Sequence, residues 1–565
     1  MSSLVLHPTT HPAVVVYPRD SINRLPSELL LHIFEILQAQ QDRQLQGFQA
    51  KWIRVTWVCR RWRHIALHCR MLWTTLSFFH HPRDRSAVST LLNRARRAPL
   101  DLFLRPQMFE YVRSRVNPIQ RLAVGFHDRQ AAWVRNFVER VGAPMRSLIL
   151  SRDKPEPTLQ FCINPDALPN LRALTIQHFA PVVPGTFRGL TQLSIVNVWE
   201  HPETTLYGLL NACPDLEELY IFDSLPLRER YTVQRPGELV PVRLPRMRRL
   251  RMCDSSGWDL GWFLQWIRIP ASASFYVEAS YANTPPDPDE YEGWLAGDLF
   301  PQPLHALPMV AQSQSIAVYL GSAALEEDFR LFGLNEAALT GDQHDSAWGI
   351  KVGSLDVGKT GTPASGNDDD GPRSMLPVCC PYVLRDLPKL VEASKILSMQ
   401  LHVAPGLPGQ CNWDAWLASF PNLGAMIVGG APLIESILEH LRKRGDLLPR
   451  LEALQFCVAV LPEDPHNAYV DLDVFAAWLA ARRLAGRQIK QFAVRVPSVA
   501  TVQTTSLAAQ LFARATAQGV DEPSSFVIDT CRTCHFVFDA GECAEGVRVD
   551  GLLSERRRDT VEARV

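Results

Sequence analysis

The residues best suited to chemistry lie in two short motifs of the C-terminal half. The first, residues 353–360, has the spacing of a phosphate-binding loop and ends in Lys359 and Thr360. In such a loop, backbone N–H groups and the N-terminus of a following helix hold the phosphates. Glycines, prolines and three consecutive aspartates crowd the residues that should form this helix. We therefore expect a disordered insert over residues 353–374, and a nucleotide-binding protein that uses Gly353 to Thr360 remains the alternative from another class.

The second motif, Cys531-Arg-Thr-Cys534-His535, matches the attachment motif of c-type haem and also resembles a zinc site. Four side chains could serve as tetrahedral zinc ligands: Cys531, Cys534, His535 and Cys543. Adjacent residues of a strand point to opposite faces, which is poor geometry for Cys534 and His535 together. We expect a terminal hairpin with incidental thiols at residues 526–528 and 536–538. We also expect no bound metal, no cofactor and no catalytic residues.

The length and composition of the chain argue against several other classes of protein. The chain has 565 residues, 46% hydrophobic and 21% charged, which is too long for one hydrophobic core. Lys and Arg number 58 and Asp and Glu 59, so no global field favours nucleic acid or an anionic membrane. No apolar run approaches the ~18 residues that span a bilayer. Residues 1–21 indicate a disordered leader rather than a signal peptide, and scattered cysteines indicate reduced thiols, so we expect an intracellular chain in the cytoplasm, the nucleus or both.

Two amphipathic segments near the N-terminus predict a pair of helices. Pro26 suits a first helical turn, and the apolar residues after it recur at helical spacing: Leu29, Leu30, Ile33, Phe34 and Leu37. A glutamine-rich connector follows at residues 38–49. In the second segment the residues of one apolar face step by three and four: Trp52, Val55, Cys59, Trp62 and Ala66. Leu72-Trp73 closes the segment.

The order of these motifs resembles an F-box over residues 22–80, with Leu25-Pro26-x-Glu28-Leu29-Leu30 first and Cys59-Arg60-Arg61-Trp62-Arg63 later. The second motif is similar to that of a large fungal group of F-box proteins. The resemblance implies docking to the adaptor subunit of an SCF-type ubiquitin ligase and, through it, to cullin. It also implies the contact residues: Leu25, Pro26, Leu29, Ile33, Val58, Cys59, Trp62, Leu72 and Trp73. The glutamine-rich connector is longer than the segment that joins the corresponding helices in the F-box pattern.

Two other interpretations of the N-terminal segment stay open. One is an ordinary amphipathic helical pair that packs on its own domain. The other is a nucleic-acid surface, because residues 43–83 contain no acidic side chain and interleave arginines with tryptophans. The tryptophans fall on the apolar face, however, which favours a core or a protein interface.

The rest of the chain shows one returning pattern, apolar-x-x-apolar-x-apolar. It begins at ten anchors: Ile119, Met145, Leu171, Leu190, Leu216, Met247, Ile396, Leu423, Leu451 and Ile489. Most successive anchors are separated by 19 to 31 residues, close to the period of leucine-rich repeats. We therefore expect an α/β chain, with a small helical F-box followed by an irregular leucine-rich-repeat-like solenoid at residues 119–545. Residues 81–118 should be a helical linker or cap, and residues 546–565 a frayed tail.

These patterns predict a non-enzymatic adaptor. The F-box would dock to the ligase and the repeat body would bind an unknown target protein. An F-box protein with a scaffold role that directs no degradation is the alternative within the same class.

Overall fold

The structure is a computed structural model of the 565-residue chain. It describes these residues: 22–42, 51–78, 85–109, 112, 118–153, 160–198, 203–224, 241–254, 260, 263–280, 307–323, 326–333, 348–353, 387–388, 391–403, 412–457, 471–495, 502–518 and 526–527. They divide into two compact units, one ending at Leu122 and the other beginning at Ala123. The leader at 1–21, most of the insert at 353–374 and the tail at 546–565 lie outside the described residues.

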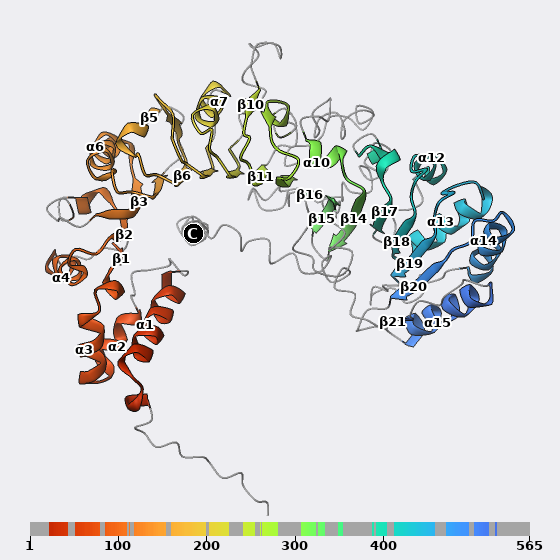
Figure 1. The fold of residues 1–565 in the computed structure, drawn as a ribbon, viewed down its shortest axis with the longest axis horizontal. Helices are drawn as coiled ribbons and strands as arrows, with labels where there is room; N and C mark the ends of the chain where they lie inside the picture. Colours follow the sequence, from red (N-terminus) through yellow and green to blue (C-terminus); the bar gives the residue numbers. More distant parts are fainter. Residues whose placement is uncertain are drawn as a thin grey trace, which may run out of the picture. The chain divides into compact units, whose positions relative to one another are not determined.

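The first unit begins with a bundle of short helices, at the red end of the colour range in Figure 1. Its elements are η1 (Ile22–Arg24), α1 (Ser27–Asp42), η2 (Lys51–Arg54), α2 (Val55–Val58), α3 (Arg60–His68), η3 (Arg70–Trp73), β1 (Thr75–Ser77), α4 (Arg85–Ala95), β2 (Leu100–Leu104) and η4 (Pro106–Met108). Helix α1 packs on α3, and α4 packs on η3. Residues 81–118 contain the expected helix as α4, and also strand β2, which pairs in parallel with β1.

The second unit is built on parallel strands that follow one another along the chain. Strand β3 (Ile119–Phe126) crosses the boundary between the two units. The main strands that follow it are β4 (Ser147–Arg152), β6 (Ala173–Gln177), β8 (Gln192–Val196), β9 (Glu218–Phe222), β11 (Arg249–Asp254), β13 (Ser274–Ser280), β16 (Trp348–Gly353), β17 (Ser398–Val403), β18 (Ala425–Gly429), β19 (Ala453–Cys457), β20 (Gln491–Arg495) and β21 (Phe526–Val527). From β4 to β13 each main strand pairs in parallel with the next, and so do the strands from β17 to β21.

An antiparallel pair interrupts this parallel order. Strands β14 (Ser315–Ala323) and β15 (Glu326–Gly333) pair antiparallel, and β15 pairs antiparallel with β16. Parallel pairing resumes on either side, between β13 and β16 and between β14 and β17. These strands lie between the anchors Met247 and Ile396, where the pattern gives no anchor, and short apolar alternations at Ile316 and Ile350 do not reveal the reversal of direction.

The main strands lie where the apolar pattern predicts them. Apart from Ile119, which opens β3 itself, each anchor lies two residues before its strand. In β6, for example, Leu171 precedes the strand, and Leu174 and Ile176 point into the core, where all three are at most 1% exposed. Alternate residues of a strand face opposite sides, so the same spacing buries one row of side chains per strand. These inward side chains pack on those of the neighbouring strands. Burial of apolar surface in this way stabilises the fold by about 25 cal/mol per Å² removed from water.

Helices and short strands form the return segments between these strands, and the helices lie along one side of them (Figure 1). The helices are α6 (Ala131–Val141), α7 (Glu203–Asn211), α10 (Pro308–Ala311), α12 (Trp413–Ala418), α13 (Ala431–Lys443), α14 (Leu472–Leu484) and α15 (Val502–Ala517). The short strands pair with one another: β5 (Gln160–Cys162) with β7 (Ala180–Val182) and β10 (Val242–Arg243) with β12 (Ile267–Arg268). The architecture is thus mixed helix and strand with parallel sheets. Among the described residues, no helix combines the length and apolar character needed to cross a bilayer.

A shared turn ends three consecutive strands. His178, Asn197 and Asp223 follow β6, β8 and β9, and all three have positive φ, at 65°, 51° and 42°. Each N–H donates to a carbonyl on the next strand, with N···O distances of 3.0, 2.8 and 2.8 Å. Polar residues such as Asn and Asp tolerate this left-handed conformation better than branched ones. The turn therefore aligns successive strand ends and keeps their faces in register.

Candidate partner-binding surface

The core of the helical module is made of aromatic side chains. Phe34 of α1 packs on Trp62 of α3, with ring centroids 5.1 Å apart. Trp52 meets Trp73 edge-on at 4.9 Å, and the Trp73 indole N–H donates to the carbonyl of Ala66 at 2.8 Å. The Trp73 side chain is completely buried. These contacts fix α1, α3 and η3 as one framework.

Arg94 of α4 closes this core from one side. Its guanidinium carbon lies 4.4 Å from the centroid of the Trp73 ring, which is a cation–π contact. Burial lowers the pKa of Arg94 from its ordinary value. The aromatic core thus extends beyond the predicted F-box into α4.

The turn at Cys59 decides which side chains face outward. Cys59 has extended backbone between α2 and α3, and its Sγ accepts a hydrogen bond from the N–H of Trp62 at 3.4 Å. Val55 and Thr56 point inward on α2 and are 6% exposed. Trp57 and Val58 consequently face outward and are 70% and 60% exposed.

Helix α1 presents a second apolar stripe. Its inner face buries Leu30 and Phe34 completely. On the other side Leu29 is 50% and Ile36 45% exposed, and Ile33 lies half-buried between them. Residues four and three positions apart lie on one helical face, so the three side chains form a continuous stripe.

A hydrogen bond links the start of α1 to α3. The Arg61 guanidinium donates to the carbonyl of Leu25 at 2.6 Å, which holds Leu25 and the exposed Pro26 beside α3. A second arginine, Arg63, donates to the carbonyl of Thr56 at 2.8 Å and holds the end of α2. The basic side of α3 therefore positions the apolar residues as well as carrying charge.

The nine predicted contact residues fall into two groups in the structure. Exposed or half-buried are Leu25, Pro26, Leu29, Ile33, Val58 and Cys59. Buried are Trp62, Leu72 and Trp73, at 8%, 0% and 0% exposure. Within this conformation the buried three support the surface from below, and their direct contact with a partner stays a prediction.

Three further apolar residues are exposed although no sequence motif marks them: Trp57, Ile36 and Met71, at 70%, 45% and 53%. Trp57 lies outside the three- and four-residue steps that mark the buried face. Several large apolar residues that gather off the buried face of neighbouring helices indicate a second contact surface. We name the set Leu29, Ile33, Ile36, Trp57 and Val58 the outer apolar residues.

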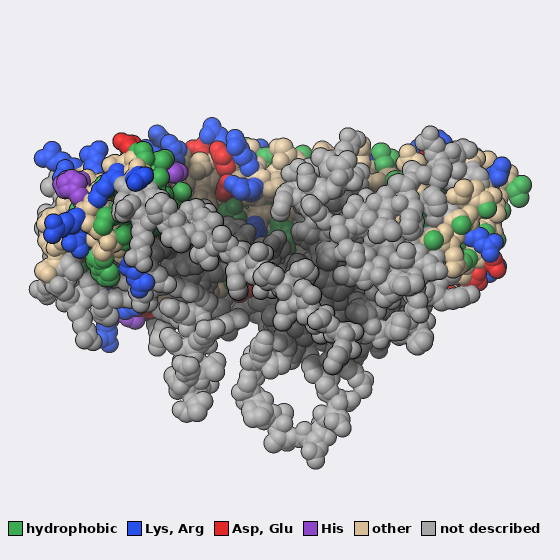
Figure 2. All heavy atoms as spheres, turned by 90° about the horizontal axis from the view of Figure 1, so that it is seen from below, with side chains coloured by type: hydrophobic (Ala, Val, Ile, Leu, Met, Phe, Trp, Pro, Cys, Tyr) green, Lys and Arg blue, Asp and Glu red, His purple; other side chains and the backbone are tan. Residues whose placement is uncertain are grey.

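Basic side chains accompany these residues. Exposed on α3 are Arg60, Arg61, Arg63, His64 and His68. Figure 2 shows basic and histidine side chains beside hydrophobic ones in the region of these helices. Three of the four tryptophans, Trp52, Trp62 and Trp73, are buried and cannot stack on bases, so the aromatic platform expected for single-stranded nucleic acid is reduced to Trp57.

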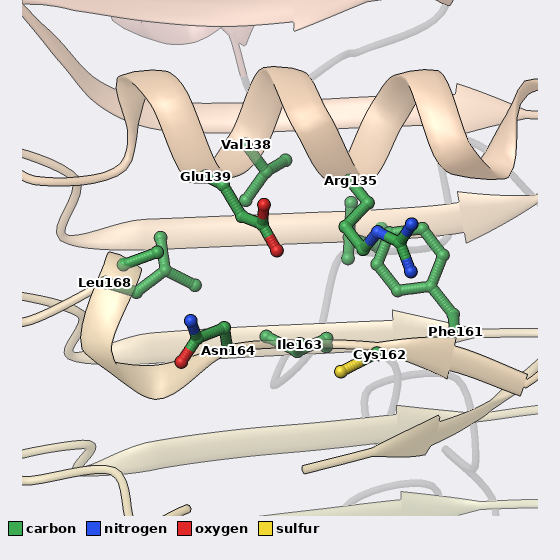
Figure 3. A pocket seen from close by; sticks show the side chains of 10 residues that line it. Arg135, Val138, Glu139, Phe161, Cys162, Ile163, Asn164 and Leu168 are labelled. Carbon is green, nitrogen blue, oxygen red and sulfur yellow. The ribbon is translucent and has the colours of Figure 1, made fainter. Parts of the chain in front are cut away.

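A small hollow exists in the second unit, between α6 and β5. Figure 3 shows Arg135 and Glu139 of α6 above Phe161, Cys162 and Asn164. Its volume is ≈ 10 Å³, space for a single water molecule at most. This hollow is too small to hold a substrate or cofactor.

The two chemical motifs of the sequence lie largely outside the described residues. Gly353 ends β16, while Lys359 and Thr360 are not among the described positions, and the same holds for Cys531, Cys534, His535 and Cys543. Strand β21 pairs in parallel with β20, and the partner strand of the expected hairpin is also outside. Within the part of the chain that the structure describes, no three His, Cys, Asp or Glu side chains gather as a metal site would require.

Comparison with known proteins identifies the helical module. No curated protein is significantly similar to the chain. Residues 22–79 match the F-box-like family. Domains of this family generally mediate binding to the adaptor subunit of SCF-type ubiquitin ligases, and proteins that carry them are typically non-enzymatic. The chain therefore carries an F-box-like domain at residues 22–79.

Proposed function

We propose that this protein is a substrate-recognition subunit of an SCF-type ubiquitin ligase. The observation that supports this function most directly is the exposure of the outer apolar residues within the F-box-like domain. Trp57 and Val58 on α2 and Leu29 on α1 are each at least 50% exposed, although the same helices bury a complete aromatic core beneath them. Exposed aromatic and aliphatic side chains on a rigid framework are what a hydrophobic interface requires.

Docking would remove these side chains from water. Full burial of one large apolar side chain is worth about 1.5–3 kcal/mol, and a central tryptophan is the commonest kind of interface hot spot. The arginines of α3 would surround this contact and orient an acidic partner surface, which affects association rate more than affinity. The adaptor would therefore contact α1, α2 and the Cys59 turn.

The second unit would bind the target protein. Its strands return with nearly even spacing, as in leucine-rich repeats, and they offer a row of outward side chains on each strand. Binding a target near the ubiquitin carrier raises its effective concentration, and the transfer chemistry belongs to other subunits. The contribution of this chain to catalysis is proximity.

Co-purification of the full chain with the ligase adaptor tests the docking role. Trp57→Ala should reduce adaptor capture strongly. Trp133→Ala is a matched control, because Trp133 is also an exposed tryptophan, 38% exposed, but lies on α6 of the second unit. Equal capture by both variants, or no capture by the folded wild type, would exclude this surface as the adaptor site.

The half-life of a proven binding partner separates degradation from scaffolding. If Trp57→Ala lengthens the half-life and Trp133→Ala does not, the protein directs degradation. An unchanged half-life with intact adaptor binding would identify a scaffold role instead.

A further inference from the structure

The residue that immediately precedes each main strand of the second unit lies at the edge of the sheet where the strands begin. At two places along this edge a basic residue pairs with an acidic one. Arg248, before β11, lies 3.5 Å from Glu217, before β9. Lys490, before β20, lies 2.8 Å from Glu452, before β19. Opposite charges on neighbouring strands are the arrangement that stabilises a sheet.

The same position holds two arginines at the beginning of β4 and β6. Arg146 precedes β4 and Arg172 precedes β6, and the register of these strands makes the two arginines neighbours. Both are exposed, and we name them the arginine pair. Among the described residues the Arg146 guanidinium has no hydrogen-bond or ion-pair partner, and that of Arg172 donates only to the backbone carbonyl of Gly189, at 2.8 Å. Like charges on adjacent strands are destabilising, so the stability of the sheet does not explain this pair.

Hydrogen bonds hold the backbone segments of the arginine pair side by side. The N–H of Arg172 donates to the carbonyl of Arg146 at 2.8 Å. The side chain of Asn170 donates to the carbonyl of Ala143 at 2.7 Å and joins the two loops. Gly189 has a φ of 89°, and a Cβ atom at this position would collide with the Arg172 guanidinium. The two arginines are therefore neighbours before any partner binds, which lowers the entropic cost of binding.

The nearest acidic residue on the side of β8 and β9 is already engaged. The Asp215 carboxylate lies 2.9 Å from the guanidinium of Arg246 and accepts the N–H of Gly189 at 3.1 Å. Glu217, two residues later, is paired with Arg248. These carboxylates therefore leave the charge of the arginine pair uncompensated.

The remaining charges of the adjoining segments are mainly basic. Arg188, in the loop before β8, is exposed. On α6, the helix that leads into β4, two arginines, Arg135 and Arg140, accompany one glutamate, Glu139. Asp166, on η6 (Pro165–Ala167), is exposed and makes no ion pair with any described residue. This part of the surface thus carries an excess of positive charge.

We propose that the arginine pair binds an acidic segment of the target protein through two Asp or Glu side chains. Each guanidinium is a planar fork that can donate two parallel hydrogen bonds to one carboxylate. Parallel strands lie about 4.8 Å apart, so two acidic side chains of one segment can engage both arginines. The bound carboxylates supply the negative charge that Glu217 and Glu452 supply elsewhere along this edge. The inference rests on the proposed function of the second unit as the target-binding part.

Selection from a phage-displayed library of random dodecapeptides on the immobilised full chain tests this site. Peptides retained by the wild type should be enriched in Asp and Glu relative to the input library. The double variant Arg146→Gln with Arg172→Gln should lose this enrichment. Retained peptides without acidic enrichment, or no retained peptides, would overturn the proposal.

A matched control is the double variant Arg248→Gln with Lys490→Gln. It removes the same number of positive charges from the same position before a strand, but each of these residues has its own glutamate. Arg248 is three strands from Arg172, roughly 14 Å at about 4.8 Å per strand, which exceeds the Debye length of about 8 Å at physiological ionic strength. The control should therefore keep the acidic enrichment.

Fluorescence anisotropy with one selected acidic peptide gives the magnitude. The arginine-pair variant should raise the Kd on the order of tenfold or more, and the control should change it by about twofold at most. Arg146→Lys with Arg172→Lys should raise the Kd less, because it keeps both charges and loses only the forks. Equal effects of the two glutamine double variants would overturn the proposal.

The single variant Arg146→Gln separates binding from folding. The Arg146 guanidinium makes no hydrogen bond or ion pair with the described residues, so its removal should weaken peptide binding without lowering the urea midpoint of unfolding. Weaker binding accompanied by a lower midpoint would indicate a structural role for Arg146 and overturn the proposal.

Adaptor capture by the same variants separates this inference from the proposed function. The arginine-pair variant should capture the adaptor like the wild type. Acidic peptide binding without adaptor capture by the wild type would overturn the ligase role and leave the arginine pair intact. The opposite result would overturn the role of the arginine pair alone.

Discussion

The helical module and the parallel sheet handle apolar side chains in opposite ways. Twelve large apolar side chains among the described residues are exposed, and seven of them belong to the module at residues 22–78. The second unit, which is several times longer, has only five. The module thus concentrates apolar surface, whereas the sheet removes it from water.

The difference follows from how each part obtains neighbours. A strand in the sheet has a strand on each side and a return segment below it, so its inward residues are covered by repetition. The helices of the module have no repeating neighbours of this kind. Each buries one face against a small core that contains Trp52, Trp62 and Trp73. The exposed apolar side chains of the module come from a few consecutive helices, whereas those of the second unit are scattered singly along a much longer chain, as is normal for a protein surface.

Removal of Trp73 should produce the largest change. Trp73→Ala should lower the stability of the module by about 3–5 kcal/mol, because the side chain is fully buried and supports both Trp52 and Arg94. Hydrogen exchange read by mass spectrometry should show lost protection over residues 51–78. Unchanged protection there would mean that the aromatic core is not what holds the module together.

A cavity in the sheet should behave differently. Leu219→Ala should lower stability by about 2–5 kcal/mol, since the Leu219 side chain on β9 is completely buried. Because β9 pairs with both β8 and β11, exchange should rise on these strands as well. A loss confined to β9 alone would contradict the cooperative stacking that distinguishes the sheet from the module.

The buried side chain of Arg482, on α14, holds neighbouring segments of the second unit together through hydrogen bonds. Its side chain is 1% exposed and donates to the carbonyls of Leu447, Leu448, Leu451 and Arg487 at 2.9–3.3 Å. Burial lowers the pKa of Arg482 to about 10, so it remains charged at neutral pH. Arg482→Met should lower the free energy of unfolding by about 2 kcal/mol, because these carbonyls lose their donor.

Urea denaturation at neutral pH measures this loss. Because this pKa stays well above 7, the side chain keeps its charge and its donors around neutral pH, and the loss in stability should not depend on pH there. Stability of Arg482→Met equal to the wild type at pH 7 would show that the desolvation of the guanidinium offsets its hydrogen bonds.

The smallest effect is expected for the ion pair on the outward face. A double-mutant cycle with Glu218→Gln and Arg249→Gln should give a coupling free energy below about 1 kcal/mol, because the Arg249 side chain is 60% exposed. The coupling should decrease as salt is added. A coupling free energy of several kcal/mol would show that this ion pair fixes the register of β9 and β11 instead of adding little to stability.

The sequence by itself determined the positions of the repeating strands. The apolar pattern that begins at Leu171, for example, predicts β6, and the one that begins at Leu423 predicts β18. The helical spacing that begins at Leu29 likewise predicted α1. These features are local, because alternation and helical spacing are written in consecutive residues.

Only the tertiary structure decided which residues are buried and which face a partner. Trp57 and Trp62 are both tryptophans of one predicted helical segment, yet the extended backbone of Cys59 places the first outward and the second inward. The register that places Arg251 between Tyr220 and Tyr276 likewise joins residues 31 and 25 positions apart. Such contacts are set by packing between distant segments, which no local pattern encodes.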